Sequence, residues 1–382
     1  MPLPPGVYRA DHVGSFLRPP ALKEARSAFQ SGTITPDQLR SIEDAHIKTV
    51  VTAQLAAGLR SPTDGEFRRA YFHIDFLQRL RGVEAKGQIA STATHTEGFA
   101  PPRLVVTGKL AHDQPIQVAD YEFLAQAIKD AASAQGGDVR ATPKVCIPSP
   151  TMVHFRGGRA SIDISAYPDV EDFFADLAAA YRAELAALYA AGARFVQLDD
   201  TNLAYLCDPK MRADVAARDR FSAAELTRRY AALINAALEG KPEDLKIGIH
   251  LCRGNYRSQW FASGGYEPVA EVLFQELNVD AYFLEYDDAR SGDFAPLRFL
   301  PEHKVVVLGL MSSKLPQLDD KATIIQRLHE AAKVCPKGLE QLCLSHQCGF
   351  SSTQEGNELS EEEQWAKVRL EVEIAKEVWG DA

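Results

Sequence analysis

The sequence predicts a (β/α)8 barrel, a closed ring of parallel strands surrounded by helices. Eight short apolar runs alternate along the chain with longer segments of helical periodicity, the order that builds a parallel sheet with crossover helices. No internal repeat or low-complexity tract interrupts this order. A chain of 382 residues, 46% hydrophobic and 25% charged, is long enough to bury a large core. The expected strands are Ala10 to Ser15, Ser61 to Glu66, Lys144 to Ser149, Arg194 to Asp200, Lys246 to Cys252, Ala281 to Asp287, Lys304 to Ser313 and Gln341 to Cys348.

Capping signals mark the expected helices. In "TPDQLRSIEDAHIKTVVTAQLAAG", Thr35 caps the start, Pro36 opens the first turn, Gln38 completes a capping box and Gly58 ends the helix. A second long helix closes in the same way at Gly192. Further helices are expected around Phe221 to Leu238, Asp319 to Val334 and Ser360 to Val378. Helical pattern therefore follows each strand.

The second and third strands are separated by more residues than a strand-to-helix connection normally needs. The segment contains the Gly- and Pro-rich stretch "EGFAPPRLVVTGKL". We expect a hairpin insertion at about 83–140, placed beside the barrel mouth. With this insertion, residues 1–382 form one barrel domain.

Charge and composition exclude several classes of protein. The formal net charge of −10 would repel nucleic acid, and no basic stripe offsets it. The N-terminus lacks a signal pattern, and no apolar stretch reaches the roughly 18 residues of a membrane span. Six scattered cysteines indicate thiols or metal ligands rather than a disulfide framework. We therefore expect a cytoplasmic protein.

Four metal-ligating side chains fall where expected strands end. His250 and Cys252 close the fifth strand, Glu285 lies near the end of the sixth, and Cys348 follows the eighth. Active sites of such barrels lie at the carboxyl ends of the strands. Residues i and i+2 of a strand face the same way, so His250 and Cys252 suit chelation of zinc, which takes imidazole, thiolate and carboxylate ligands. The plainer interpretation is a hydrogen-bonded histidine beside small buried cysteines.

A rival ligand set has the same spacing. His346 and Cys348 repeat the H-x-C pattern, so two such pairs would make a closed Cys2His2 site of structural rather than catalytic character. Glu285 as fourth ligand would be displaced more easily than a thiolate or imidazole. Both sets stay open at the level of sequence.

Two further carboxylates lie on the same expected rim. Glu66 and Asp199 end the second and fourth strands, where they suit an ammonium-bearing substrate. The alternative is a salt bridge to Arg68 or Arg69. His12 either lines the pocket or serves as a structural histidine. The stretch "RGGRAS" lacks the setting of a phosphate loop and reads as a lid or turn.

Seven motifs, taken together and in order, resemble the cobalamin-independent methionine synthases, in particular the short single-barrel relatives of their C-terminal half. The resemblance covers nearly the whole chain, and the combination is specific although each piece alone is not. The motifs are "HVGSFLRP", "DGEFRR", "QLDD", "IHLCRGN", "FLEYDD", "LGLMSSK" and "LSHQCGFSST".

The resemblance implies a zinc ion held by His250, Cys252, Glu285 and Cys348. It also implies a homocysteine pocket, in which Ser15 receives the substrate carboxylate while Glu66 and Asp199 hold its ammonium group. The implied reaction moves a methyl group from a folate or a corrinoid protein to the thiol of homocysteine. This thiol is expected to bind zinc through its sulfur and to displace Glu285. The expected enzyme is a zinc-dependent thiol S-methyltransferase of methionine biosynthesis, with a homo-oligomer as an option.

The sequence also departs from the family. The family's histidine after the seventh strand, which is thought to protonate the leaving group, is replaced by "GLMSSKLP", offering Ser312, Ser313 or Lys314. The folate-stacking tryptophan after the third strand has no counterpart, and the nearest candidates are Met152, His154 and Phe155. The N-terminal half that embraces polyglutamyl folate is missing.

Three alternatives remain, the first within the same resemblance and the other two from different classes of protein. An epoxyalkane:coenzyme M transferase would bind a sulfonate thiol, which Glu66 and Asp199 would repel. A non-catalytic zinc-binding barrel would use the closed Cys2His2 set. A metal-free decarboxylase would need no zinc.

Overall fold

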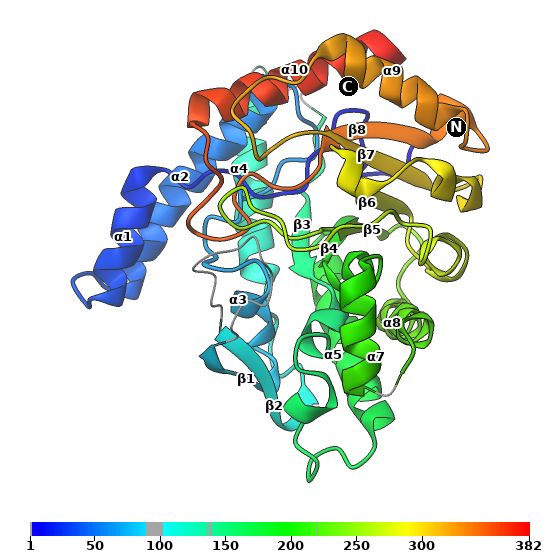
Figure 1. The fold of residues 1–382 in the computed structure, drawn as a ribbon. Coiled ribbons are helices and arrows are strands. Elements are labelled where there is room, and N and C mark those ends of the chain that lie inside the picture. The colour runs from blue at the N-terminus through cyan, green and yellow to red at the C-terminus, as the bar shows by residue number, and fades with distance from the viewer. Residues whose placement is uncertain (1, 89–101, 135, 137–139, 220) are drawn as a thin grey trace.

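A six-stranded parallel sheet forms the centre of the structure, a computed structural model that describes residues 2–88, 102–134, 136, 140–219 and 221–382 (Figure 1). Its strands pair in chain order, each with its successor. They are β3 (Val145–Pro148), β4 (Phe195–Asp200), β5 (Lys246–Leu251), β6 (Ala281–Glu285), β7 (Val305–Met311) and β8 (Leu342–His346). The fold is therefore α/β with a parallel sheet.

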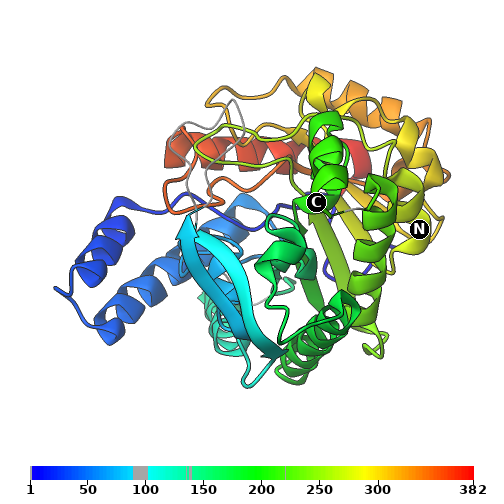
Figure 2. The same cartoon turned by 60° about the horizontal axis from the view of Figure 1, so that its bottom comes forward.

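Helices cover the outside of the sheet (Figures 1 and 2). The α-helices are α1 (Pro20–Gln30), α2 (Pro36–Ala57), α3 (Ile74–Leu77), α4 (Val118–Ala134), α5 (Val170–Ala190), α6 (Asn202–Tyr205), α7 (Pro209–Asp219), α8 (Ala223–Leu238), α9 (Lys321–Ala332) and α10 (Glu361–Trp379). Short 3-10 turns are η1 (Pro150–Val153), η2 (Gly158–Ser161), η4 (Ala289–Ser291), η5 (Ala295–Phe299) and η6 (Gly338–Gln341), and η3 (Val272–Glu276) is a π-helix. Helix α1 and the start of α2 extend away from the rest of the molecule (Figures 1 and 2).

The capping signals predict the helix ends well. Thr35 and Gln38 form the expected capping box at α2, and Gly58 ends it with a φ of 104°. Ser360 opens α10 in the same way. By contrast, η3 alone fills the place of a helix between β5 and β6, and only η4 and η5 lie between β6 and β7. In these two connections the expected helical structure is therefore present only as a π-helix and short 3-10 helices, without a long α-helix.

The first two expected strands are not strands. Ala10 makes an isolated parallel bridge to Leu344, and its neighbour Asp11 donates its N–H to Leu344 O (3.0 Å). The main-chain oxygens of Arg60 and Pro62 accept from Thr142 and Lys144 (2.8 and 3.1 Å). The segment at Ala10 and the segment at Ser61 contact each other through side chains and not through a ladder of main-chain hydrogen bonds.

Local chemistry explains why these segments do not continue as strands. Ser61 Oγ donates to Asp11 Oδ1 (2.6 Å), and His12 Nε2 lies 2.8 Å from Ser61 O. Gly14 takes a φ of 128°, and Pro62 has no N–H to give to a ladder. The chain turns at these points, and the polar side chains satisfy the main chain.

Part of the expected insertion is an antiparallel pair. Strand β1 (Arg81–Gln88) pairs with β2 (Pro102–Ala111), and α4 follows. The rest of 83–140 includes positions 89–101, 135 and 137–139, which lie outside the described residues.

Both faces of the parallel sheet are buried, as a sheet flanked by crossover segments requires. Phe195, Phe283 and Val307 pack in one apolar cluster, whereas their chain neighbours Val196 and Leu284 pack in another. The hydrophobic alternation therefore holds the strands from both sides and leaves their ends to carry polar residues.

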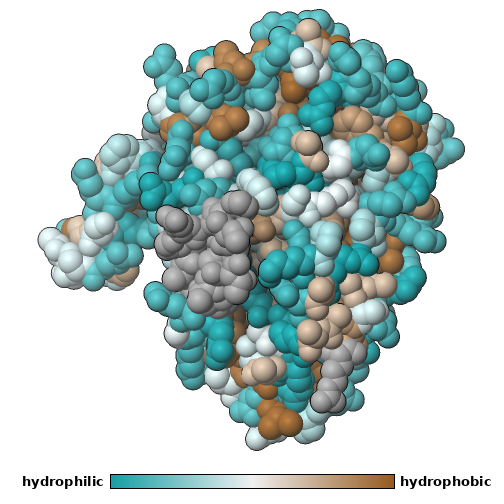
Figure 3. Space-filling model, in the orientation of Figure 1, coloured by the Kyte–Doolittle hydropathy of each residue, from teal (hydrophilic) through white to brown (hydrophobic). Residues whose placement is uncertain are grey.

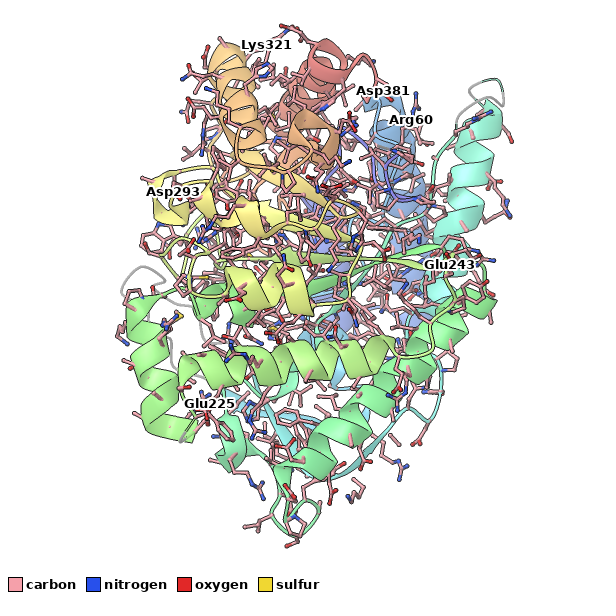
Figure 4. All side chains as sticks on the ribbon, turned by 90° about the vertical axis from the view of Figure 1, so that its right-hand side faces the viewer. Arg60, Glu225, Glu243, Asp293, Lys321 and Asp381 are labelled. Atoms are coloured by element: carbon pink, nitrogen blue, oxygen red, sulfur yellow. The ribbon has the colours of Figure 1, made fainter. Side chains whose placement is uncertain are left out.

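The two ends of the sheet are distinct. Glu225, Asp293 and Lys321, which follow strands β4, β6 and β7, lie on one side in Figure 4, and Arg60 and Glu243 lie on the opposite side. On the face seen in Figure 1, hydrophilic residues dominate the surface and hydrophobic ones are scattered (Figure 3). No helix in the described part of the chain is long and apolar enough to cross a membrane.

Candidate metal centre

Four ligand-bearing side chains meet at the carboxyl ends of β5, β6 and β8. One ligand atom from each of His250, Cys252, Glu285 and Cys348 lies within 4.8 Å of the others, and all four residues are buried. The two sulfur atoms are 3.3 Å apart. Because β5 to β8 are parallel neighbours, residues that end them share one edge although the chain separates them by up to 98 positions (348 minus 250).

The donor set fits a zinc ion. His250 Nδ1 lies 3.3 Å from Phe283 O, which assigns the proton to Nδ1 and leaves Nε2 as a ligand atom. Nε2 is buried and has no hydrogen-bond partner among the described residues, and the same is true of Glu285 Oε2. Buried polar atoms normally have partners. Two sulfurs, one imidazole nitrogen and one carboxylate oxygen are ligands that zinc takes in a tetrahedron.

The neighbouring main chain orients these ligands. Glu285 Oε1 accepts the N–H of Arg253 (3.0 Å), and Cys252 Sγ accepts the N–H of Gly254 (3.3 Å). The hydrogen bond from Cys252 to Cys348 holds the pKa of the Cys348 thiol well below its ordinary value and raises that of Cys252.

A pocket opens beside the four residues. His250, Cys252 and Cys348 form part of its wall. Other polar residues on the wall include Ser15, Glu66, Asp199, Asn255, Ser352 and Thr353, and the apolar and aromatic ones include Tyr71, Phe72, Tyr205 and Phe261. The pocket therefore places sulfur ligands, carboxylates and aromatic rings around one space.

Glu66 and Asp199 line this pocket and lie close to each other and to Cys146. Ligand atoms of the three lie within 4.8 Å of one another. Burial raises the pKa of Glu66 to about 7 and that of Asp199 to about 6; the neighbouring Asp199 adds to the rise at Glu66. Glu66 Oε2 has no hydrogen-bond partner among the described residues, and Arg69 Nη1 lies 4.0 Å from Oε1. Two buried carboxylates side by side are stabilised by a cation between them.

Ser15 lies where the sequence predicts, on the pocket wall, and its Oγ accepts the N–H of Ser351 (3.3 Å). His12 is not among the wall residues. Its Nε2 lies 2.8 Å from Ser61 O and its ring contacts Phe16 at 5.1 Å, so it has the structural role that the sequence left as an alternative.

The two serines expected to donate a proton do not line the pocket. Ser313 Oγ donates to Gly349 O (3.1 Å), and Ser312 Oγ accepts the N–H of Lys314 (3.2 Å). The prediction of a direct catalytic role for Ser312 or Ser313 is not supported by this geometry, because the loop after β7 turns both hydroxyls toward main-chain groups.

His346 lies apart from the four-residue group. Its Nδ1 is 2.7 Å from Glu371 Oε2 on α10, and both side chains are buried. Strand β8 ends at His346, and the pairing of β7 with β8 shifts register between Gly309 and Met311. Cys348 therefore lies beyond the strand, where the i, i+2 rule no longer applies, and the closed Cys2His2 alternative is wrong.

Several wall residues escaped the sequence analysis. Arg156, in the stretch interpreted as a lid or turn, lines the pocket, as does His73. No spacing rule identifies them, because loops from different parts of the chain bring them together. Met152, His154 and Phe155, named as replacements for a stacking tryptophan, are buried elsewhere; His154 Nδ1 lies 2.8 Å from Tyr230 OH.

Known proteins share this architecture. The family described as the catalytic domain of cobalamin-independent synthases matches residues 9–377. An uncharacterized protein of Bacillus subtilis, YxjH, is 44% identical over 373 residues, which cover 97% of this chain and 95% of that protein. The crystal structure of a putative vitamin-B12 independent methionine synthase from Listeria monocytogenes has a TM-score of 0.76 and 38% identity, covering 98% of both chains.

A B12-independent methionine synthase from Shewanella sp. W3-18-1, in complex with selenomethionine, shares the fold with a TM-score of 0.66 at 18% identity, over 91% of this chain and 90% of that one. The family match at residues 9–377 includes all six strands of the parallel sheet and the four residues of the candidate metal centre. The chain belongs to the cobalamin-independent methionine synthase family and corresponds to its catalytic domain.

Proposed function

We propose that this protein is a zinc-dependent methyltransferase that moves a methyl group to the thiol of homocysteine and so forms methionine. The observation that supports this most strongly is the meeting of His250, Cys252, Glu285 and Cys348 within 4.8 Å at the wall of a pocket that also contains Glu66 and Asp199. A thiol-activating ligand set and an ammonium site then face the same space.

In this proposal the four residues hold zinc, and the bound ion lowers the pKa of a substrate thiol so that the nucleophilic thiolate forms at neutral pH. Glu285 would be the residue of the four most easily displaced by a substrate thiol, because a carboxylate oxygen binds zinc less strongly than a thiolate. Arg253 N–H then still holds Glu285 Oε1. His250, Cys252 and Cys348 keep their places.

Glu66 and Asp199 bind the substrate ammonium group, and Ser15 with its main chain binds the carboxylate. An ammonium ion offsets the repulsion between two buried carboxylates, whereas a sulfonate would add to it. The pair therefore favours an amino-acid thiol over coenzyme M.

For the methyl donor we propose a methylfolate. The family is described as cobalamin-independent, which disfavours the corrinoid protein that the sequence left open. Phe72, Tyr205 and Phe261 on the pocket wall offer aromatic faces for a flat ring system in place of the missing tryptophan.

We further propose that the chain is one barrel domain over 1–382, with an insertion at about 83–140. The bridge at Ala10 and the hydrogen bonds of Arg60 and Pro62 support a ring of eight segments, in which the first two join through Asp11 and Ser61.

The test is zinc X-ray absorption on the purified protein with and without L-homocysteine. We expect two sulfur ligands to become three. Cys252→Ser should lose zinc, whereas the control Cys335→Ser, a buried cysteine outside the group, should keep it. An unchanged sulfur count with homocysteine and a rise with coenzyme M would favour the coenzyme M transferase. No change with either thiol would indicate a structural zinc site.

A further inference from the structure

Arg253 directly follows the ligand Cys252, and its side chain is fully buried. Its guanidinium donates to Gly264 O from Nε and Nη2 (3.2 and 2.7 Å) and to Glu285 O from Nη1 (3.0 Å). Nη1 also donates to Tyr266 OH (2.8 Å), and the guanidinium carbon lies 4.2 Å from the centre of the Tyr266 ring. One side chain thus joins the end of β6 to the loop that follows β5.

The main chain of Arg253 makes a second set of contacts with the same two segments. Its N–H donates to Glu285 Oε1 (3.0 Å), and its oxygen accepts from Phe261 and Ala262 (2.9 and 3.0 Å). Tyr266 OH in turn accepts the N–H of Glu285 (3.0 Å). Glu285 is therefore held at its carboxylate, its main-chain oxygen and its main-chain nitrogen.

These contacts fix which carboxylate oxygen is available. The main-chain N–H of Arg253 occupies Oε1, and Oε2 is the buried oxygen without a hydrogen-bond partner among the described residues, so Oε2 is the oxygen we assign to the metal. The loop fastened by the guanidinium also carries Phe261, which lines the pocket.

Charge adds a second reason for an arginine here. Two thiolates and a carboxylate around a divalent cation leave one negative charge in a buried site, and a neighbouring cation lowers the cost of burying it. Arginine keeps its charge at all relevant pH values, and its planar fork reaches several acceptors at once. Lysine carries the charge but cannot span Gly264, Tyr266 and Glu285 together.

We propose that Arg253 is a positioning residue that presents Glu285 as a single-oxygen, displaceable zinc ligand and fixes the pocket wall beside it. This inference rests on the proposed function, since it assumes that the four-residue group binds zinc.

The experiment compares Arg253→Lys with wild type in zinc affinity, measured by chelator competition, and in zinc X-ray absorption. We expect zinc to bind about 10–100-fold more weakly, the size usual for loss of a partner of a metal ligand. We also expect the absorption spectrum to lose the oxygen ligand while the two sulfurs remain. Zinc affinity is measured at a temperature at which the zinc-free variant is shown to be folded, because lysine leaves buried acceptors of Arg253 unpaired and should lower the zinc-free unfolding temperature.

The matched control is Arg194→Lys. Arg194 also lies 4.2 Å from a tyrosine ring and donates to main-chain oxygens, but it precedes β4 at the other end of the sheet. It should leave zinc affinity unchanged.

Equal zinc affinity and an unchanged oxygen ligand in Arg253→Lys would overturn the inference, as would a lower zinc-free stability with unchanged affinity. If Arg253→Lys does not fold, Tyr266→Phe decides, because it removes the hydroxyl that joins Arg253 to Glu285 and should weaken zinc binding in the same direction. Absence of zinc from the wild type would instead contradict the proposed function.

Discussion

Glu66 adopts a φ of 59°, a left-handed conformation that a residue with a side chain rarely takes, and its carboxylate is buried beside Asp199. Strained backbone and an unpartnered buried oxygen both cost free energy of folding. A side chain kept in this state serves a bound group better than it serves stability. The strained backbone and the unpartnered Oε2 therefore favour a substrate cation as the partner of Glu66 Oε2.

Glu66→Gln tests this interpretation. We expect KM for homocysteine to rise by roughly 10–100-fold, because a hydrogen bond to a charged group contributes about 1.5–3 kcal/mol. Zinc content and unfolding temperature should stay near wild-type values. Steady-state kinetics and metal analysis check both, with Glu358→Gln on the surface as control. Loss of zinc from Glu66→Gln would assign the carboxylate to the metal instead.

At the scale of elements, helix α2 shows how a local signal is converted into structure. Thr35 Oγ1 accepts the N–H of Gln38 (3.2 Å), and Gln38 Oε1 accepts the N–H of Thr35 (2.8 Å). Both bonds satisfy donors that a helix start leaves unpaired. The start of α2 lies on the part of the molecule that extends outward (Figure 1).

Thr35→Ala should therefore loosen this helix start by about 1 kcal/mol. We expect faster hydrogen exchange in the first turn of α2 and unchanged activity. Thr52→Ala, an exposed threonine in the middle of the same helix, is the control and should not speed exchange. If the first turn of α2 exchanges no faster in Thr35→Ala than in wild type, ion pairs such as that between Arg40 and Asp120, rather than the cap, stabilise this helix start.

The burial of His154 should make the packing of the η1 turn against α8 depend on pH. Burial lowers the pKa of His154 to about 4. Asp219 opposes this shift, and the cations Arg218, Arg229 and Arg159 add to it. The unfolded chain takes up the proton near pH 6.5. The stability that depends on neutral His154 is therefore complete above pH 6.5 and is lost as pH falls toward 4, by up to about 3 kcal/mol.

Chemical unfolding at pH 7.5 and pH 5 measures this loss. In His154→Gln the difference between the two pH values should shrink, although the variant starts less stable because it changes the contact with Tyr230. An identical pH slope in the variant would assign acid sensitivity to other buried groups.

At the scale of the whole molecule, the ligand group ties together strands that are far apart in the chain. A metal ion that binds only the folded state stabilises it by about 2.7 kcal/mol when its free concentration is 100 times Kd. We therefore expect a chelator to lower the unfolding temperature of the wild type by several degrees and to leave Cys252→Ser unchanged. Thermal scans with and without dipicolinate check this, and equal shifts in both proteins would mean that the chelator acts elsewhere.

The sequence by itself determined the helix caps, six parallel strands and the common strand-end position of the four residues of the candidate metal centre, because each depends on local chemistry or on the strand end that a residue occupies. Tertiary structure alone decided that His346 faces Glu371 rather than the ligand group, since β8 ends before Cys348. It also decided that the segments at Ala10 and Ser61 meet the sheet at single points. Arg156 and Phe261 reach the pocket through loops whose paths no periodicity encodes, so their role depends on packing between distant parts of the chain.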